Sequence, residues 1–390
     1  MSGVTSGRTW AIVLAGGSGT RLSCLTSGAD GEAVPKQFCS LDGGLTLIEQ
    51  TLARAAKVAD RDCVTAIVAS AHRRYWSAAL KSLLPENLVV QPRNRGTAIG
   101  ILLPALRIAA RDPQARIVIL PSDHHVADES ALEHALRCAL EDVRCHPGGV
   151  ALLGIEADEP DPELGYIVCD PASHRRLRQV HRFIEKPRID EALRLVRQGA
   201  LWNSFILVCR ARSLIDLISR RYLDIVQMFE AVGIDDEASL RELYRELPEI
   251  DFSRDVAAGQ EGALAVMAVP RCGWSDLGTP HRLAQTLARW PTQCWRNATT
   301  RSSRADGWIN LAERLAQVHP TCCTRRESSP RQAQSSDEVR HEASVVRNVG
   351  RARARSSRGA LVLARNPDLG PHRRATPARL PRTGRGHCHA

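Results

Sequence analysis

The sequence predicts an α/β fold in which a Rossmann-like, mostly parallel mixed sheet is flanked by helices. Short apolar runs with branched side chains alternate with longer amphipathic stretches along the first half of the chain, and the first run ends in a glycine-rich turn. Strands separated by helices of this length imply a parallel sheet covered on both faces. A content of 43% hydrophobic and 25% charged residues is that of a globular protein. In such sheets, ligands bind beyond the carboxyl ends of the strands.

The first expected strand covers residues 10–14, and the glycine-rich turn follows at residues 16–19. Three glycines in four positions let main-chain N–H groups approach a ligand where a β-carbon would block it. We therefore expect a polyphosphate there, with Arg21 beside it. The spacing fits neither a serine-hydrolase turn nor a dinucleotide fingerprint, because Thr20 and Leu22 stand where those motifs need glycine. A plain turn between a strand and a helix explains this loop, taken alone, equally well.

The other expected elements follow from hydrophobic periodicity. In the first half we expect strands at residues 64–70, 88–91, 116–120 and 150–154, and helices at 45–56, 72–84, 97–110 and 130–145. In the second half we expect strands at residues 165–168, 180–185, 205–209 and 263–270, and helices at 189–198, 211–247 and 281–290.

Two aspartates, Asp123 and Asp276, stand in turns that follow expected apolar strands. Two carboxylates from distant strands can hold Mg²⁺, which keeps several waters and substrate oxygens in its coordination. Taken alone, Asp123 is more commonly a helix cap or a turn residue. The neighbouring His124 and His125 have no partners at metal-ligand spacing, so we interpret them as ordinary loop histidines.

Lysine is rare in this chain, with four residues against 49 arginines, so it marks positions that need a compact ammonium group. Two of the four, Lys36 and Lys186, lie beside other candidate site residues. If Glu185 and Lys186 share a strand, their side chains point to opposite faces. One can then hold sugar hydroxyls while the other meets a phosphate. A surface charge pair before Pro187 is the alternative explanation.

The net charge of +10 belongs to the end of the chain. Residues 291–390 contain 19 arginines, no lysine and 7 acidic residues, which is +12, so the first 290 residues carry −2. The twelve cysteines form no C-x-x-C pair, which favours a reducing compartment. The apolar run near the N-terminus is too short for a signal peptide, and no run approaches the length of a membrane span. We expect a cytoplasmic protein with no membrane partner.

Six motifs carry a resemblance to a known family: LAGGSGTRL, PKQF, PSDHHV, FIEKP, WNS and WSDLGTP. In this order and at these separations they resemble the sugar-1-phosphate nucleotidylyltransferases. PKQF together with RGTA is most similar to the mannose-1-phosphate guanylyltransferase branch. The resemblance covers residues 10–290, so we expect a catalytic domain at residues 1–290 and an arginine-rich tail at residues 291–390.

The resemblance implies transfer of GMP from GTP to α-D-mannose 1-phosphate, giving GDP-mannose and pyrophosphate, with Mg²⁺ as cofactor. It assigns catalytic roles on the phosphates to Arg21, Lys36 and Lys186. It assigns nucleotide binding to Leu14, Ala15, Gly16, Gly17, Ser18, Gly19 and Thr20, and contact with the base to Arg95, Gly96, Thr97 and Ala98. It assigns the sugar phosphate to Gly165, Glu185, Lys186 and Asn203, and the metal to Asp123 and Asp276.

The sequence departs from this family at four positions. Cys24 replaces a common proline, Gly96 a common asparagine, Ile99 a common proline, and Phe205 the glycine that usually follows WNS. These departures fall on the base and sugar pockets and leave two alternatives open. One is a nucleotidylyltransferase for another sugar 1-phosphate or triphosphate, such as the glucose-1-phosphate type. The other is a catalytically impaired chain that binds nucleotide. A dimer is compatible with the sequence.

The tail has no sustained period, so we expect mostly disorder, with a short helix at residues 309–318. It lacks the alternating strands of the C-terminal isomerase domain that some family members carry, so we expect no isomerase activity. Its arginine clusters could bind a polyanion nonspecifically, or the segment could be translated out of frame. We favour the second explanation, because no interleaved aromatic residues are present to stack on bases.

Overall fold

The computed structural model describes residues 7–27, 31–145, 148–170, 175–290, 294 and 309–318, and every structural statement below concerns these residues. The chain divides into two units, Met1–Glu327 and Ser328–Ala390, and all described residues belong to the first.

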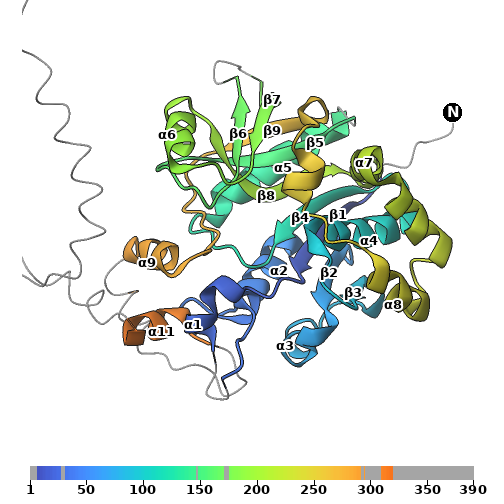
Figure 1. Ribbon diagram of the computed structural model, residues 1–390, viewed down its shortest axis with the longest axis horizontal. Coiled ribbons are helices and arrows are strands. Elements are labelled where there is room, and N and C mark those ends of the chain that lie inside the picture. The colour runs from blue at the N-terminus through green and yellow to red at the C-terminus, as the bar shows by residue number, and fades with distance from the viewer. Residues whose placement is uncertain are drawn as a thin grey trace, which may run out of the picture. The chain divides into compact units, whose positions relative to one another are not determined.

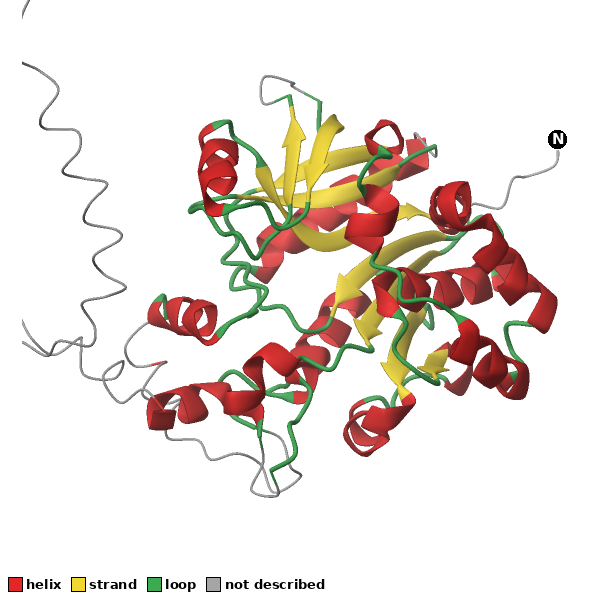
Figure 2. Ribbon diagram, viewed as in Figure 1, coloured by secondary structure: helices red, strands yellow, loops and turns green. Residues whose placement is uncertain are grey.

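The described strands form one mixed sheet of nine strands in the order β3-β2-β1-β4-β8-β5-β9-β7-β6. Figure 2 shows the strands in yellow with the helices in red around them. Strands β1 to β4 are parallel to one another, and so are β5 and β9. Strand β8 is antiparallel to β4 and β5 and also pairs antiparallel with β6, and β7 is antiparallel to both β6 and β9. The predicted class is therefore confirmed, with parallel pairing concentrated in the first half. The strands are β1 (Thr9–Ala15), β2 (Val64–Ala69), β3 (Leu88–Gln91), β4 (Arg116–Pro121), β5 (Val150–Glu156), β6 (Tyr166–Cys169), β7 (Leu177–Ile184), β8 (Leu201–Arg210) and β9 (Leu264–Val269).

Helices cover both faces of this sheet (Figure 1). They are α1 (Ser23–Thr26), α2 (Leu47–Val58), α3 (Arg73–Ala79), α4 (Gly96–Arg111), α5 (Glu129–Cys145), α6 (Ile189–Arg197), α7 (Ala211–Val232), α8 (Glu237–Glu246), α9 (Pro280–Ala288) and α11 (Leu311–Val318). Short 3₁₀ turns occur at Thr20–Leu22, Lys36–Phe38, Ser70–His72, Pro85–Asn87 and Glu261–Ala263, and a π-helical turn at Phe252–Ala257.

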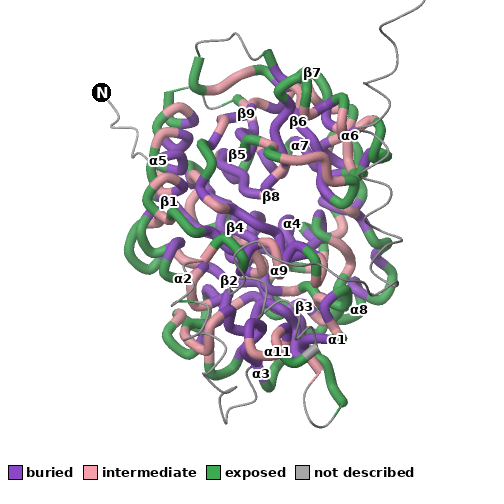
Figure 3. Tube along the Cα trace, turned by 90° about the vertical axis from the view of Figure 1, so that its left-hand side faces the viewer, coloured by how far each residue is buried: buried purple, intermediate pink, exposed green. Residues whose placement is uncertain are grey.

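The alternation of side chains along β1 shows how the two faces are filled. Trp10 and Ile12 join a core cluster with α4, α7 and α8. Ala11, Val13 and Ala15 join a second cluster with α2 and α5 on the opposite face. Successive residues of a strand point to opposite faces, and both sets are buried here, which is typical of a strand covered on both sides. Figure 3 shows the buried residues concentrated along the central strands.

Most predicted elements are present, with boundaries shifted by a few residues. The single helix expected at residues 211–247 is divided into α7 and α8, because the chain leaves the helix at Gly233, which has φ 78°, and α7 itself is kinked at Tyr222. Trp202 and Asn203, which we placed before an apolar strand, lie within β8. Glu185 and Lys186 follow β7, which ends at Ile184, so the argument from opposite faces of one strand does not apply.

The helix predicted at residues 309–318 is present as α11 and packs on the folded unit. Leu311 and Leu315 are buried in the core cluster that contains α2 and α5. The main chain of Ser40 accepts a hydrogen bond from Leu311 N at 2.8 Å and donates one to Ile309 O at 2.9 Å. The folded part of the chain therefore extends past residue 290. The disorder predicted for the rest of the tail falls outside the described residues. Within them, no helix has the length and apolar character needed to span a membrane.

Candidate active site

The glycine-rich loop begins where β1 ends and is shaped by Gln37. The amide of Gln37 donates hydrogen bonds to Ala15 O at 3.0 Å and Gly17 O at 2.8 Å. Gly19 has φ 62°, and a β-carbon there would lie 3.0 Å from the main-chain nitrogen of Lys36. A β-carbon on Gly17 would meet no atom within 4 Å. Packing therefore requires glycine at position 19, whereas position 17 is open toward the cavity.

The two candidate metal ligands are brought together by main-chain pairing. Asp123 follows β4, and Asp276 lies between β9 and α9. His125 and Ser275 exchange two main-chain hydrogen bonds, each 2.9 Å long, which hold the two segments side by side. The buried ammonium of Lys36 lies 2.9 Å from Asp123 Oδ2 and donates to Asp276 O at 2.5 Å. Two segments that are distant in the sequence are thus fixed at one place.

The second aspartate is held by groups on its own turn. Oδ1 of Asp276 accepts a hydrogen bond from Gly278 N at 3.1 Å and lies 3.4 Å from Arg282 Nε. The buried Arg282 also pairs with Asp161 and lies over the ring of Trp202 at 5.1 Å. These contacts leave Oδ2 of Asp276 without a hydrogen bond among those formed by the described residues.

The arrangement fits a divalent cation. Burial alone would raise the pKa of Asp123, but Lys36 and His124 outweigh it and hold that pKa at about 2, so the carboxylate is ionised. Each aspartate keeps one oxygen that is not used by a cationic side chain within 3.5 Å. In the part of the chain that the structure describes, no three His, Cys, Asp or Glu side chains converge on one point. A cation at this place would complete its coordination with water and substrate oxygens, as Mg²⁺ commonly does.

Arg21 lines the same cavity as the two aspartates, at its edge. Its guanidinium is about half exposed and pairs with Glu163 at 3.1 Å. A β-carbon on Gly278 would lie 2.3 Å from Asp276 Oδ2 and 3.4 Å from Arg21 Nη1. Because Gly278 has no side chain, a space remains between the guanidinium of Arg21 and the carboxylate of Asp276.

A second group of polar residues lies at the ends of β6, β7 and β8. A β-carbon on Gly165 would lie 2.6 Å from Glu185 Oε2, so these two residues touch. Asn203 N donates to Gly165 O at 2.8 Å, and Asn203 Nδ2 donates to Ser253 Oγ at 3.3 Å. Burial, reinforced by the charge of Asp251, raises the pKa of Glu185 to about 6. This end of the site offers hydroxyl, amide and carboxyl groups at close range.

The segment predicted to contact the base starts α4, and only part of it faces the cavity. Gly96 has φ 82°, and a β-carbon there would lie 2.3 Å from Ile250 O. The hydroxyl of Thr97 donates to Asp251 Oδ2 at 3.2 Å. The guanidinium of Arg95 is instead bound to two main-chain oxygens of α8, and Ala98 is buried.

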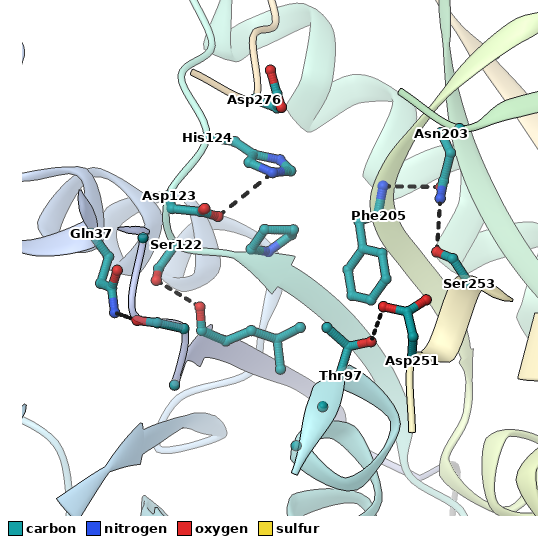
Figure 4. A pocket seen from close by; sticks show the side chains of 18 of the residues that line it. Gln37, Thr97, Ser122, Asp123, His124, Asn203, Phe205, Asp251, Ser253 and Asp276 are labelled. Carbon is teal, nitrogen blue, oxygen red and sulfur yellow. Dashed lines mark hydrogen bonds and ion pairs between the residues drawn. The ribbon is translucent and has the colours of Figure 1, made fainter. Parts of the chain in front are cut away.

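These groups surround one cavity of about 360 Å³ (Figure 4). Most predicted site residues line it, namely Leu14, Gly16, Gly17, Gly19, Arg21, Gly96, Thr97, Asp123, Gly165, Glu185, Lys186, Asn203 and Asp276. The others do not: Ala15, Ser18, Thr20, Lys36, Arg95 and Ala98. Lys36 is 4% exposed, and its ammonium is bound to protein oxygens, so the structure assigns it to joining the aspartate segments. Its predicted contact with phosphate stays a prediction.

Several lining residues escaped the sequence interpretation, namely Gln37, Gln91, His124, Asp251, Ser253 and Trp274. His124 is not an ordinary loop residue, because its ring packs edge-on against the ring of Trp274 with a centroid distance of 5.3 Å. Burial has the largest effect on its pKa and lowers it. Its place directly after Asp123 was the available signal. Ser253 belongs to a π-helical turn, and Asp251 caps that turn. A pattern in which a polar residue follows an apolar strand does not predict site residues in such a turn.

Backbone strain is concentrated at this site. Among the described residues, four that are not glycine have φ between 48° and 63°: Asp62, Lys186, Phe205 and Leu277. Lys186 and Phe205 line the cavity, and Leu277 directly follows Asp276. Such conformations cost free energy and gather at functional sites, where the surrounding structure holds them in place.

The fold and the site define an α/β protein with a polar cavity beyond the ends of its parallel strands. The family model of the nucleotidyl transferases matches residues 10–291, and the chain belongs to this family. It is 31% identical to the mannose-1-phosphate guanylyltransferase of Escherichia coli (strain K12), over 69% of this chain and 57% of that protein. It is 31% identical to mannose-1-phosphate guanylyltransferase ManC of Salmonella typhimurium, over 72% of this chain and 60% of that protein. The chain thus spans less than two thirds of the length of these relatives.

Solved structures agree with the fold. A crystal structure described as a mannose-1-phosphate geranyltransferase from Thermus thermophilus superposes with a TM-score of 0.64 at 29% identity. The match covers 73% of this chain and 81% of that chain. The sequence resemblance to nucleotidylyltransferases is therefore confirmed at the level of the family.

Proposed function

We propose that this chain transfers GMP from GTP to α-D-mannose 1-phosphate and releases pyrophosphate, with Mg²⁺ bound by Asp123 and Asp276. The observation that carries the proposal is that the glycine loop, both aspartates and the polar residues Gly165, Glu185 and Asn203 all line one cavity. The main-chain N–H groups of the loop can bind a triphosphate, and the side chains of Glu185 and Asn203 can bind sugar hydroxyls. The names of the relatives in Escherichia coli and Salmonella typhimurium support guanine and mannose as the specific substrates.

The reaction balances without a protein nucleophile. A phosphate oxygen of the sugar 1-phosphate forms a bond to the α-phosphorus of GTP, and the bond from that phosphorus to the bridging oxygen of the β-phosphate breaks. Pyrophosphate leaves with that oxygen and its electron pair. The protein must align two anions and offset their repulsion, so positioning and positive charge are its main contributions. Bound Mg²⁺ supplies positive charge on the phosphate oxygens.

Individual residues have distinct parts in this proposal. The loop at residues 16–19 places main-chain groups along the triphosphate. Arg21, at the edge of the cavity, stabilises negative charge on the departing pyrophosphate. Lys186 holds the sugar phosphate, while Glu185 and Asn203 orient the sugar hydroxyls.

A grid of pyrophosphate-release assays tests the proposal. Four nucleoside triphosphates are combined with the 1-phosphates of mannose, glucose and galactose. We expect the highest kcat/KM for GTP with mannose 1-phosphate. A higher value for another pair identifies a related nucleotidylyltransferase, which the departures at Gly96 and Phe205 favour as the second candidate. Binding of GTP without release from any pair indicates a catalytically impaired chain.

A further inference from the structure

Phe205 has an unusual main-chain conformation for its position in a strand. It lies inside β8 with φ 57°, in the left-handed region that favours glycine. The pairing of β8 with β5 is interrupted here, because the register passes from Leu152↔Leu207 to Gly154↔Asn203. Between these two pairs one residue of β5, Leu153, stands opposite three residues of β8, Ser204 to Ile206, and Phe205 lies in the resulting bulge. Bulges beside active sites commonly redirect a side chain.

The bulge is fixed by hydrogen bonds on both sides of Phe205. Ser204 Oγ donates to Leu153 O at 2.6 Å and accepts from Ile206 N at 3.2 Å. Phe205 N donates to Asn203 Oδ1 at 3.0 Å. The last bond also orients the amide of Asn203, whose Nδ2 reaches Ser253. The conformation is thus held by its surroundings, as strained residues at functional sites are.

The ring of Phe205 lines the cavity between the end that holds Asn203 and the end that holds Thr97 and Asp251. Figure 4 shows it with Asn203 on one side and Thr97 and Asp251 on the other. It packs edge-on against Phe252, with ring centroids 6.0 Å apart and an angle of 83° between the rings. Phe252 is 1% exposed and belongs to the core, whereas Phe205 is partly exposed and lines the cavity. Burial alone therefore does not account for an aromatic residue at position 205.

We propose that Phe205 limits the size of the sugar that the site accepts. Its ring occupies space next to Asn203 and Ser253, and it rests on a buried partner, so it cannot be pushed aside easily. The site then takes unsubstituted hexose 1-phosphates and excludes those with a bulky group on the ring, such as an acetamido substituent. This inference rests on the proposed function and names the feature that restricts its substrate class.

Two substitutions separate the ring from the strain. Phe205→Gly removes the ring and relieves the strained conformation, whereas Phe205→Ala removes the ring and keeps a β-carbon at the same φ. We expect both variants to fold, and we expect Phe205→Gly to melt at a higher temperature than Phe205→Ala. Both should raise the ratio of kcat/KM for N-acetylglucosamine 1-phosphate over that for mannose 1-phosphate by at least tenfold, because both enlarge the cavity.

Phe229→Leu is the matched control. Phe229 packs edge-on against Tyr244 with a centroid distance of 6.0 Å and an angle of 82°, nearly the geometry of Phe205 on Phe252. It is buried in the same core cluster and does not line the cavity. We expect this variant to melt at a lower temperature with the ratio unchanged.

Calorimetric dissociation constants of the two sugar phosphates provide a measure that does not depend on turnover. If the wild-type chain releases no pyrophosphate with either sugar, the proposed function fails, and the ratio of dissociation constants still tests the role of Phe205. A ratio that stays within twofold of wild type in both Phe205 variants overturns the inference and leaves the proposed function intact. Absence of binding by every variant also overturns it, as does a shift of equal size in Phe229→Leu.

Discussion

The ammonium of Lys36 lies 2.9 Å from Oδ2 of Asp123 and donates a hydrogen bond to the main-chain oxygen of Asp276 at 2.5 Å. One buried cation thus connects the carboxylate of Asp123 to the main chain of Asp276, the two residues that we assign to the metal. It offsets the charge of Asp123 and fixes the turn that carries Asp276. A lysine fits this role because its compact head has three rotatable donors.

Replacing Lys36 with methionine should therefore impair both folding and catalysis. The change leaves buried carbonyl oxygens of residues 276 and 277 without their donor and removes the main group that lowers the pKa of Asp123. We expect the free energy of unfolding in urea to fall by about 3 kcal/mol. We expect kcat to fall about a hundredfold or more, because the metal ligands lose their relative position.

Lys57→Met is the control for this substitution. Lys57 is 46% exposed on the side chain and lies 3.6 Å from Glu133, so its ion pair is on the surface. We expect no resolvable change in the free energy of unfolding. Equal losses in the two variants would contradict a special role for Lys36.

Gly17→Ala separates ligand binding from stability. A β-carbon on Gly17 meets nothing within 4 Å, so the free energy of unfolding should be nearly unchanged. If the loop wraps a triphosphate, the same methyl group blocks the approach of phosphate oxygens, and the Kd for GTP should rise at least tenfold in titration calorimetry. Gly262→Ala, where a β-carbon is also free of contacts, should change neither quantity. Normal GTP affinity in Gly17→Ala would count against the phosphate loop.

Glu185 should make the chain less stable as the pH rises. Its pKa in the folded protein is about 6, above the ordinary value of 4.5. The folded state therefore binds the proton more tightly, and the free energy of unfolding decreases between pH 4.5 and pH 6. Glu185→Gln stays neutral, so its stability relative to wild type should increase by about 1.5 kcal/mol between pH 4.5 and pH 7. Urea unfolding at pH 4.5 and pH 7 measures the difference.

Glu261→Gln gives the opposite sign. Burial would raise the pKa of Glu261, but hydrogen bonds from main-chain N–H groups, including Gly259 and Phe183, outweigh it and lower that pKa. The carboxylate stabilises the fold above its ordinary pKa, and this contribution is lost as the pH falls. The glutamine variant should lose stability relative to wild type as the pH rises. Curves of the same sign for both variants would refute the assignment of Glu185.

The elements of the fold were readable from sequence where one local pattern determines them. The apolar run of β1 and the glycines after it predicted a strand and a ligand loop, and Asp123 and Asp276 were found because each follows an apolar strand. The direction of β8 was not readable, since antiparallel pairing with β4 depends on the long connection between the two strands.

The parts of the site that were missed depend on contacts between distant residues. Nothing in the sequence shows that the ammonium of Lys36 turns inward, or that the guanidinium of Arg95 binds α8. Asp251 reaches the cavity because its segment is bonded to the start of α4, for example by a main-chain hydrogen bond of 3.1 Å from Ile250 N to Arg95 O. Phe205 was visible as a departure from the family, but its left-handed conformation was not.

Helix α11 should contribute to the stability of the folded unit. Leu315 is 1% exposed and packs in the core cluster, so Leu315→Ala should lower the free energy of unfolding by about 3 kcal/mol. Leu223→Ala, at a residue that is 54% exposed, should change it by less than about 0.5 kcal/mol. Urea unfolding followed by tryptophan fluorescence compares the two. Equal stability of Leu315→Ala and wild type would show that α11 does not pack on the core in solution.

The metal assignment predicts that nucleotide binding depends on Mg²⁺ through both aspartates. Asp123→Asn and Asp276→Asn keep the size of the side chain and remove the negative charge that a hard cation requires. We expect the Mg²⁺ concentration that gives half-maximal binding of a fluorescent GTP analogue to rise at least tenfold in each variant. Asp235→Asn, which alters an exposed carboxylate beside Arg107, is the control and should bind as wild type does. An unchanged Mg²⁺ requirement in either of the first two variants would remove that residue from the metal site, and an unchanged requirement in both would end the two-carboxylate proposal.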